Sequence, residues 1–249
     1  MSYDPSHPLD PTYGTPPPAT QPLPLGEAIK QLPARYWRAV SQPRATTYAE
    51  EKGRAAWNIV WVQLIFLAVF SAIISFLVFN FYVPTIMNAY MSPAMFNSSV
   101  PSQAAQQALQ INQRIIASMQ AASVPVSLGD IIFVPLSLLI GLGILQLIAK
   151  AFGGQGTFVQ YIYGYLLFGV PLTIVSALLG FIPYLGSLVA AVIGIYHIVL
   201  QILMTMGVHR LSGGKATLVV LLPVIVIFVL AIIVFFIIFS AIMGSMMQR

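Results

Sequence analysis

The sequence has little charge and no cysteine. Only 7% of its 249 residues are Asp, Glu, Lys or Arg, while 58% are hydrophobic. A soluble globular domain carries about 25% charged residues, so this composition excludes an ordinary soluble protein. Without cysteine, the chain has no disulfide, no thiolate nucleophile and no cysteine-ligated metal site.

Motifs of membrane-embedded enzymes are also missing. There is no His-Glu-x-x-His pattern. His197 and His209 lie twelve residues apart, roughly 18 Å along a helix, which is too far to share a metal ion. Asp130 is the only aspartate near an apolar segment, so an intramembrane aspartyl protease is excluded. A serine protease stays open only if His197 is paired with a serine from another span, which would be Ser71, Ser75 or Ser137. Serines within membrane spans are mostly packing residues. We predict no enzyme, no metal site and no cofactor.

What the sequence does have is apolar length. Five segments are about as long as the roughly 20 residues that cross a bilayer: 57–83, 131–149, 158–180, 186–208 and 218–243. We therefore predict an all-α fold, a polytopic membrane bundle of five transmembrane helices over residues 57–243. Pro84 is expected to end the first span, and Asp130 to cap the second.

Basic residues predict the orientation of this bundle. Six of the eleven lie between Lys30 and Arg54, just before the first span, which indicates a membrane-facing segment rather than a nucleic-acid patch. With five spans, nine basic residues fall on the side of the N-terminus, and only Arg114 and Arg249 fall on the other. The positive-inside rule then predicts a cytoplasmic N-terminus and an outside C-terminus.

Four segments lie outside the predicted spans. Residues 1–26 are rich in proline and should be disordered, and no cleavable signal peptide is expected there. Residues 27–56 should form a basic amphipathic segment on the inner leaflet, with Tyr36 and Trp37 dipping in and a helix beginning near Thr47, three residues before Glu50. The outer loop 85–130 should contain a helix at about 103–122, and 244–249 should be a short tail.

The stretch from Ala151 to Ala216 should be a hairpin of two membrane helices. A glycine turn precedes the first helix, Pro171 interrupts and kinks that helix, and a very short turn at Pro183 reverses the chain. In the second helix Gly186, Ala190 and Gly194 recur every four residues, a stripe that lets another helix approach closely.

Three motifs in this hairpin resemble the Ypt/Rab-interacting-protein (YIP) family. Its span-three signature is similar to Tyr163-Gly164-Tyr165 followed by Pro171. The glycine turn of bacterial members resembles Phe152-Gly153-Gly154-Gln155-Gly156-Thr157-Phe158. Their turn between the last two spans is similar to Gly207-Val208-His209-Arg210-Leu211-Ser212-Gly213-Gly214-Lys215-Ala216.

This resemblance implies five spans with a cytoplasmic N-terminus in a bacterial plasma membrane. Eukaryotic members are associated with small GTPases, vesicle traffic and membrane shaping, and they carry an Asp-Leu-x-Gly-Pro element around the second span. Here only Asp130 and Pro135 loosely resemble that element, and its glycine is missing. The resemblance therefore does not extend to small-GTPase binding.

Two features leave functional alternatives open. His197 and Gln201, one turn apart on one helix face, could line a polar seam, although a packed neutral histidine is the commoner case. Gly153, Gly154 and Gly156 favour a tight turn, with lipid headgroup contact near Lys150 as the alternative.

We predict a non-enzymatic membrane-organising, scaffold or adaptor protein. Its partners would be lipids, or proteins bound through the basic segment or the helix faces, which also allow a homo-oligomer. The alternative is a small transporter or channel subunit.

Overall fold

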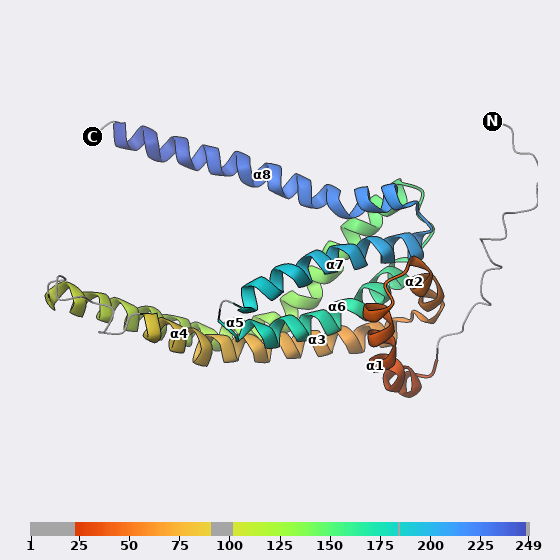
Figure 1. Cartoon of the computed structure of the whole chain (residues 1–249), viewed down its shortest axis with the longest axis horizontal. Helices are drawn as coiled ribbons and strands as arrows, with labels where there is room; N and C mark the ends of the chain where they lie inside the picture. Colours follow the sequence, from red (N-terminus) through yellow and green to blue (C-terminus); the bar gives the residue numbers. More distant parts are fainter. Residues whose placement is uncertain (1–22, 91–101, 184, 248–249) are drawn as a thin grey trace, which may run out of the picture.

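The chain folds into helices that run from a cap at one end to separate rods at the other (Figure 1). The computed structural model describes residues 23–90, 102–183 and 185–247, so most of the predicted tail 1–26 lies outside the described part. The elements are α1 (Leu25–Ser41), α2 (Ala45–Glu51), η1 (Lys52–Arg54), α3 (Trp57–Leu77), η2 (Val78–Tyr82), α4 (Val83–Tyr90), α5 (Ser102–Ala151), α6 (Phe158–Gly180), α7 (Leu185–His209) and α8 (Gly213–Met247).

Five helices are long and apolar enough to cross a membrane, which confirms the predicted architecture. They are α3 with its continuation to Tyr90, α5, α6, α7 and α8. The hairpin is also confirmed, because α6 ends at Gly180 and α7 begins at Leu185. Where the bilayer lies along the longer helices stays a prediction.

The cap consists of α1, α2 and η1, and it packs on the ends of α3, α6 and α7. Thr47 does not begin a helix, because α2 begins at Ala45 and the Thr47 hydroxyl donates to the carbonyl of Gln42. Tyr36 is half-buried, and its hydroxyl donates to Gln63 of α3 over 3.0 Å; its contact with lipid stays a prediction. Trp37 is 74% exposed.

α5 differs from the prediction in being one continuous helix of 50 residues. Asp130 lies inside it and is not an N-cap; it accepts a hydrogen bond from Ser75 of α3. Gly129 and the β-branched residues around Asp130 have low helix propensity, so packing of α5 along α3 overrides local preference and joins the polar and apolar stretches without a break. Pro125 and Pro135 are both accommodated within α5.

Pro84 does not end the first long helix. Residues Val78–Tyr82 form a π-helical turn, and α4 continues to Tyr90. Proline cannot donate a backbone hydrogen bond and crowds the preceding turn, and a π turn relieves such crowding by shifting the bonding register. α6 also continues through Pro171 without interruption, so the expected break is wrong, while a bend there stays a prediction.

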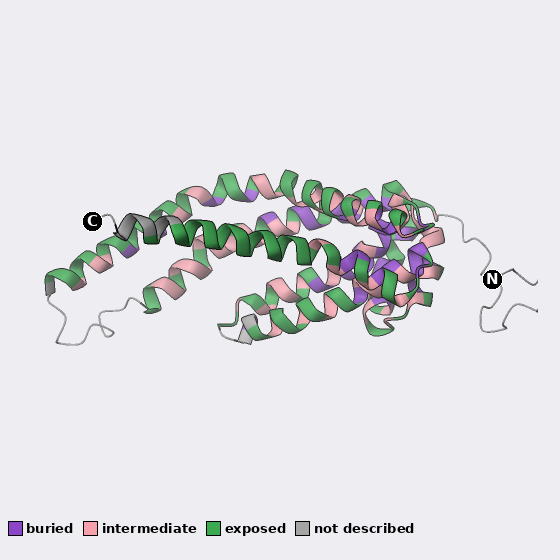
Figure 2. Ribbon diagram, turned by 90° about the horizontal axis from the view of Figure 1, so that it is seen from above, coloured by how far each residue is buried: buried purple, intermediate pink, exposed green. Residues whose placement is uncertain are grey.

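Buried residues gather at the cap end (Figure 2). The main core joins α1, α2, α3, α6 and α7, with Tyr48, Leu64 and Phe168 fully enclosed. A smaller core lies where α5 meets the beginning of α8, around Ala149 and Val219. Beyond Val220 nearly every described residue of α8 is exposed, as expected for a helix surrounded by lipid tails.

Candidate functional site at the junction of cap and bundle

Arg35 is a buried cation that ties the cap to the bundle. Its guanidinium donates to the Tyr163 hydroxyl of α6 over 2.8 Å and to the Gln31 side chain over 2.6 Å. It also pairs with Glu51 at 3.5 Å, and both side chains are at most 7% exposed. Glu51 accepts a further bond from Arg54 at 3.2 Å. One buried carboxylate and one tyrosine thus join α1, α2, η1 and α6.

Periodicity explains why Arg35 faces inward. The buried residues of α1 are Ala28, Leu32, Arg35 and Ala39, spaced by four, three and four residues. That spacing defines one face of a helix, so the arginine occupies a position where an apolar residue is usual. The sequence predicts a basic segment on the inner leaflet, but Arg35 faces the bundle instead. An arginine within an apolar helical stripe was the signal in the sequence for this buried contact.

The three residues of the Tyr163-Gly164-Tyr165 signature have separate structural roles. Tyr163 holds Arg35. Gly164 lets α7 come close, because an added Cβ would lie 3.0 Å from the Met204 side chain. The Tyr165 ring packs edge-on against Phe168 and His197, with centroids 5.2 and 5.3 Å apart. Tyr163 therefore faces the cap, Gly164 faces α7, and Tyr165 lines a hollow between α5, α7 and the beginning of α8.

The glycine turn is built against the end of α7. Gly153 has a φ of +89°, a conformation that favours glycine. A Cβ on Gly154 would lie 2.6 Å from the His209 ring, and one on Gly156 would lie 2.6 Å from Val208. The Gly156 N–H donates to His209 Nδ1 over 3.2 Å, and the Gln155 N–H donates to the His209 carbonyl over 3.1 Å. The tight turn expected from the sequence is confirmed.

His209 is fully buried at this contact and stacks obliquely on Tyr161, with ring centroids 5.0 Å apart. Its second ring nitrogen, Nε2, has no hydrogen-bond partner among the described residues. Two lysines reach over the same place. Lys52 donates to the carbonyl of Val208 over 3.5 Å, and Lys215 donates to that of Phe152 over 3.3 Å. Burial lowers the pKa of the Lys52 ammonium, and the charge of Arg210 lowers it further.

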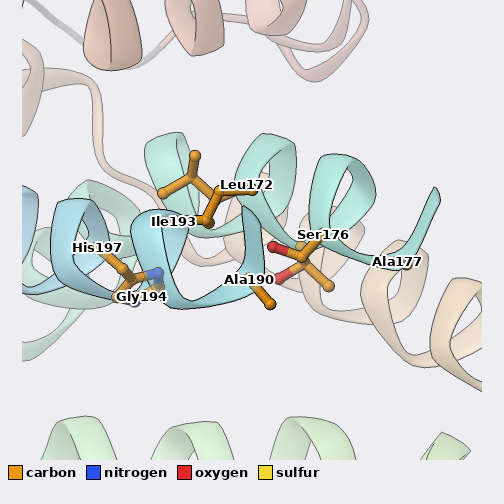
Figure 3. Close-up of a pocket in the computed structure, with 8 residues that line it drawn as sticks. Leu172, Ser176, Ala177, Ala190, Ile193, Gly194 and His197 are labelled. Carbon is orange, nitrogen blue, oxygen red and sulfur yellow. The ribbon is translucent and has the colours of Figure 1, made fainter. Parts of the chain in front are cut away.

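His197 and Gln201 line two different hollows. His197, Ala190 and Gly194 of α7 face Leu172 and Ser176 of α6 across an open groove of about 550 Å³ (Figure 3). Gln201 lines a second hollow, of about 320 Å³, between α5, α7 and the beginning of α8. The small-residue stripe therefore opens onto the groove at Ala190 and Gly194, while Gly186 is packed against the backbone of α6.

Among the described residues, no three His, Asp or Glu side chains come close enough to hold a metal ion. What the junction offers is a rigid arrangement of charges at one end of a membrane bundle. The apolar helices and the folded cap define a multi-pass helical membrane protein. A family model for the Yip1 domain matches residues 37–244, so the chain belongs to this family, as the motifs in the hairpin indicated. Comparisons with curated proteins and with solved structures find no match for the chain.

Proposed function

We propose that this chain is a non-enzymatic scaffold or adaptor that organises the membrane by holding protein partners or lipids at its cap. The observation that carries the proposal is the buried contact of Arg35 with Glu51 and Tyr163. A buried pair of this kind contributes less to net stability than to holding its elements in one arrangement. A cap fixed in this way presents one defined surface, which is what a docking platform needs.

The cap is proposed to lie in the cytoplasm, and the chain in a bacterial plasma membrane. Of the ten basic residues in the described part, only Arg114 lies away from the cap end. Such asymmetry supports a cytoplasmic cap under the positive-inside rule. Small-GTPase binding is not proposed, because the eukaryotic element is represented only by Asp130 and Pro135, which lie inside α5.

Photo-crosslinking from the cap tests the scaffold proposal. A photoreactive residue replaces Trp37, which is 74% exposed, in the full chain in its native membrane. Discrete protein adducts are expected, and Arg35→Gln should reduce their yield several-fold because it loosens the cap. A photoreactive residue at Trp61, 46% exposed on α3, is the control and should give lipid adducts only. Equal protein adducts from both positions, or none from Trp37, would contradict a protein scaffold at the cap.

Transport through a seam past His197 and Gln201 is the alternative. Their positions in separate hollows favour the scaffold. Solute and ion flux into vesicles containing the purified protein distinguishes the two functions. If the protein is a scaffold, vesicles that contain it should be no more permeable than empty vesicles. A flux that the protein raises and that His197→Leu abolishes would establish the transporter instead.

A further inference from the structure

We infer that four basic side chains around His209 bind the phosphate group of an anionic phospholipid. This inference rests on the proposed function and names a lipid class for it. The four residues, called the cationic rim, are Lys52 of η1, Lys150 at the end of α5, Arg210 in the α7–α8 turn and Lys215 at the start of α8. They come from four separate places in the sequence and meet at the glycine turn.

Hydrogen bonds and electrostatic interactions bring the rim to the glycine turn and the end of α7. Lys52 and Lys215 donate to backbone carbonyls at Val208 and Phe152, on either side of the glycine turn. The charges of Lys52 and Lys150 both act on the His209 ring, and that of Arg210 acts on Lys52. Arg210 and Lys52 are thus close enough to repel each other.

Nothing in the described part of the chain neutralises these charges. Its four carboxylates are Glu27, Glu50, Glu51 and Asp130, and none of them forms an ion pair with the rim. Glu50 and Glu51 pair with arginines of the cap. The partial charges at the helix ends do not neutralise the rim either. The C-termini of α5 and α7 each contribute about half a negative charge, while the N-termini of α6 and α8 contribute about the same positive charge. About four positive charges remain, and a bound anion would relieve their repulsion.

His209 adds an independent observation. Because Nδ1 accepts the Gly156 N–H, the neutral ring carries its proton on Nε2. This buried donor has no partner among the described residues. A buried donor without an acceptor is unfavourable, and a phosphate oxygen is an acceptor of the kind that it needs.

The surroundings of the rim favour a lipid over free phosphate. The rim lies at the ends of α5, α7 and α8, where headgroups meet a membrane bundle. One turn away from Lys150 and Lys215, the apolar side chains of Leu147 and Leu218 are 71% and 50% exposed. A charged site with exposed apolar residues directly beside it suits a headgroup together with its acyl chains.

Native mass spectrometry of the purified full chain tests the inference. The probes are dioctanoyl phosphatidylglycerol, which is anionic, and dioctanoyl phosphatidylcholine, which is zwitterionic. Lys150→Gln with Lys215→Gln should weaken phosphatidylglycerol binding about 25-fold, since a basic residue near an anionic headgroup contributes roughly fivefold. Lys30→Gln with Arg44→Gln removes two equally exposed charges outside the rim and should change the affinity less than about threefold. Phosphatidylcholine should bind weakly to all of them.

His209→Asn probes the buried donor. The Asn side-chain oxygen can still accept the Gly156 N–H, but the Nε2 donor is lost, so phosphatidylglycerol affinity should fall about tenfold. Binding is measured only on variants that keep the wild-type melting temperature to within a few degrees. If His209→Asn lowers the melting temperature further than this, the test rests on the double variant of Lys150 and Lys215.

Three outcomes would overturn the inference. The first is equal affinity for the two lipids, and the second is an equal loss in the two double variants. The third is displacement of the lipid by inorganic phosphate at concentrations near the lipid's own Kd, which would identify free phosphate as the ligand. The titration uses purified protein without partners, so its failure can be told apart from a failure of the crosslinks at Trp37.

Discussion

The cap end and the part of α8 beyond Val220 belong to one membrane protein, yet their side chains are in opposite environments, enclosed in the first and exposed in the second. At the cap end, charged and aromatic side chains are enclosed between five elements, as Arg35, Glu51 and Phe168 illustrate. The outer half of α8 consists of apolar residues that touch almost nothing else in the chain. The comparison teaches that internal contacts specify position and shape at the cap end, whereas the exposed part of α8 is a helix with almost no such contacts.

Breaking the buried ion pair should produce the largest difference. Glu51→Gln leaves the Arg35 charge buried without its carboxylate, which should lower the free energy of unfolding by about 4 kcal/mol. Glu50→Gln removes an exposed partner of Arg38, where both side chains are more than 40% exposed, and should cost about 0.5 kcal/mol. Steric trapping in bicelles measures both. Equal losses would mean that the cap is not fixed by the buried pair.

Truncating a phenylalanine at each end tests the packing side of the comparison. Phe168→Ala empties a fully enclosed site and should cost about 3 kcal/mol, chiefly as lost packing because lipid tails surround the protein. Phe235→Ala, at a residue 62% exposed on α8, should change stability by less than about 0.5 kcal/mol. The same unfolding measurement applies. A large loss for Phe235→Ala would reveal a protein partner on α8.

Adding a methyl group at two glycines of α7 sharpens the comparison further. An added Cβ at Gly207 would lie 2.1 Å from the Ala45 carbonyl oxygen, so Gly207→Ala must push α2 away and should cost about 2 kcal/mol. Gly194 has no atom within 4 Å of that position, and Gly194→Ala should be neutral or slightly stabilising. Protease sensitivity of the cap should rise only in the first variant. Intact protection of the cap in Gly207→Ala would contradict the close packing of α2 on α7.

Removing one hydroxyl from each tyrosine of the signature should have the smallest effect. Tyr163→Phe deletes an acceptor of the buried Arg35 and should cost about 1.5 kcal/mol. The Tyr165 hydroxyl has no hydrogen bond within the described chain, so Tyr165→Phe should cost less than about 0.5 kcal/mol. Melting temperatures of the two variants in one detergent give the comparison. A larger loss of stability for Tyr165→Phe than for Tyr163→Phe would contradict the role of Tyr163 in fixing the cap.

Apolar length and glycine chemistry made much of the fold predictable. Five long apolar segments specify five helices, and the short stretches around Pro183 and Gly153 can only be turns. α7 ends at His209, one residue beyond the predicted end of that span at 208. Such features are local, because each depends on residues within one helix or one turn.

The contacts of the junction were not predictable in the same way. Arg35 and Tyr163 are 128 residues apart, and either side chain alone fits an interfacial position in lipid. Asp130 is a residue type that is favoured at N-caps, but its hydrogen bond with Ser75 of α3 depends on how two helices pack. His209 is enclosed only because Gly154 and Gly156 allow a turn from elsewhere in the chain to lie on its ring. Tertiary packing decided all three.

The length of α5 has a mechanical consequence. Fifty residues of α-helix measure about 75 Å, more than twice the roughly 30 Å of the hydrocarbon core. A tilt of about 10° at the Lys150 end would therefore move the Ser102 end by roughly 13 Å. Pro125 and Pro135 each remove a backbone hydrogen bond from this rod and are the places where it bends most readily. Any rotation of α5 beside the glycine turn would therefore be enlarged at the Ser102 end, less so where the helix bends at its prolines.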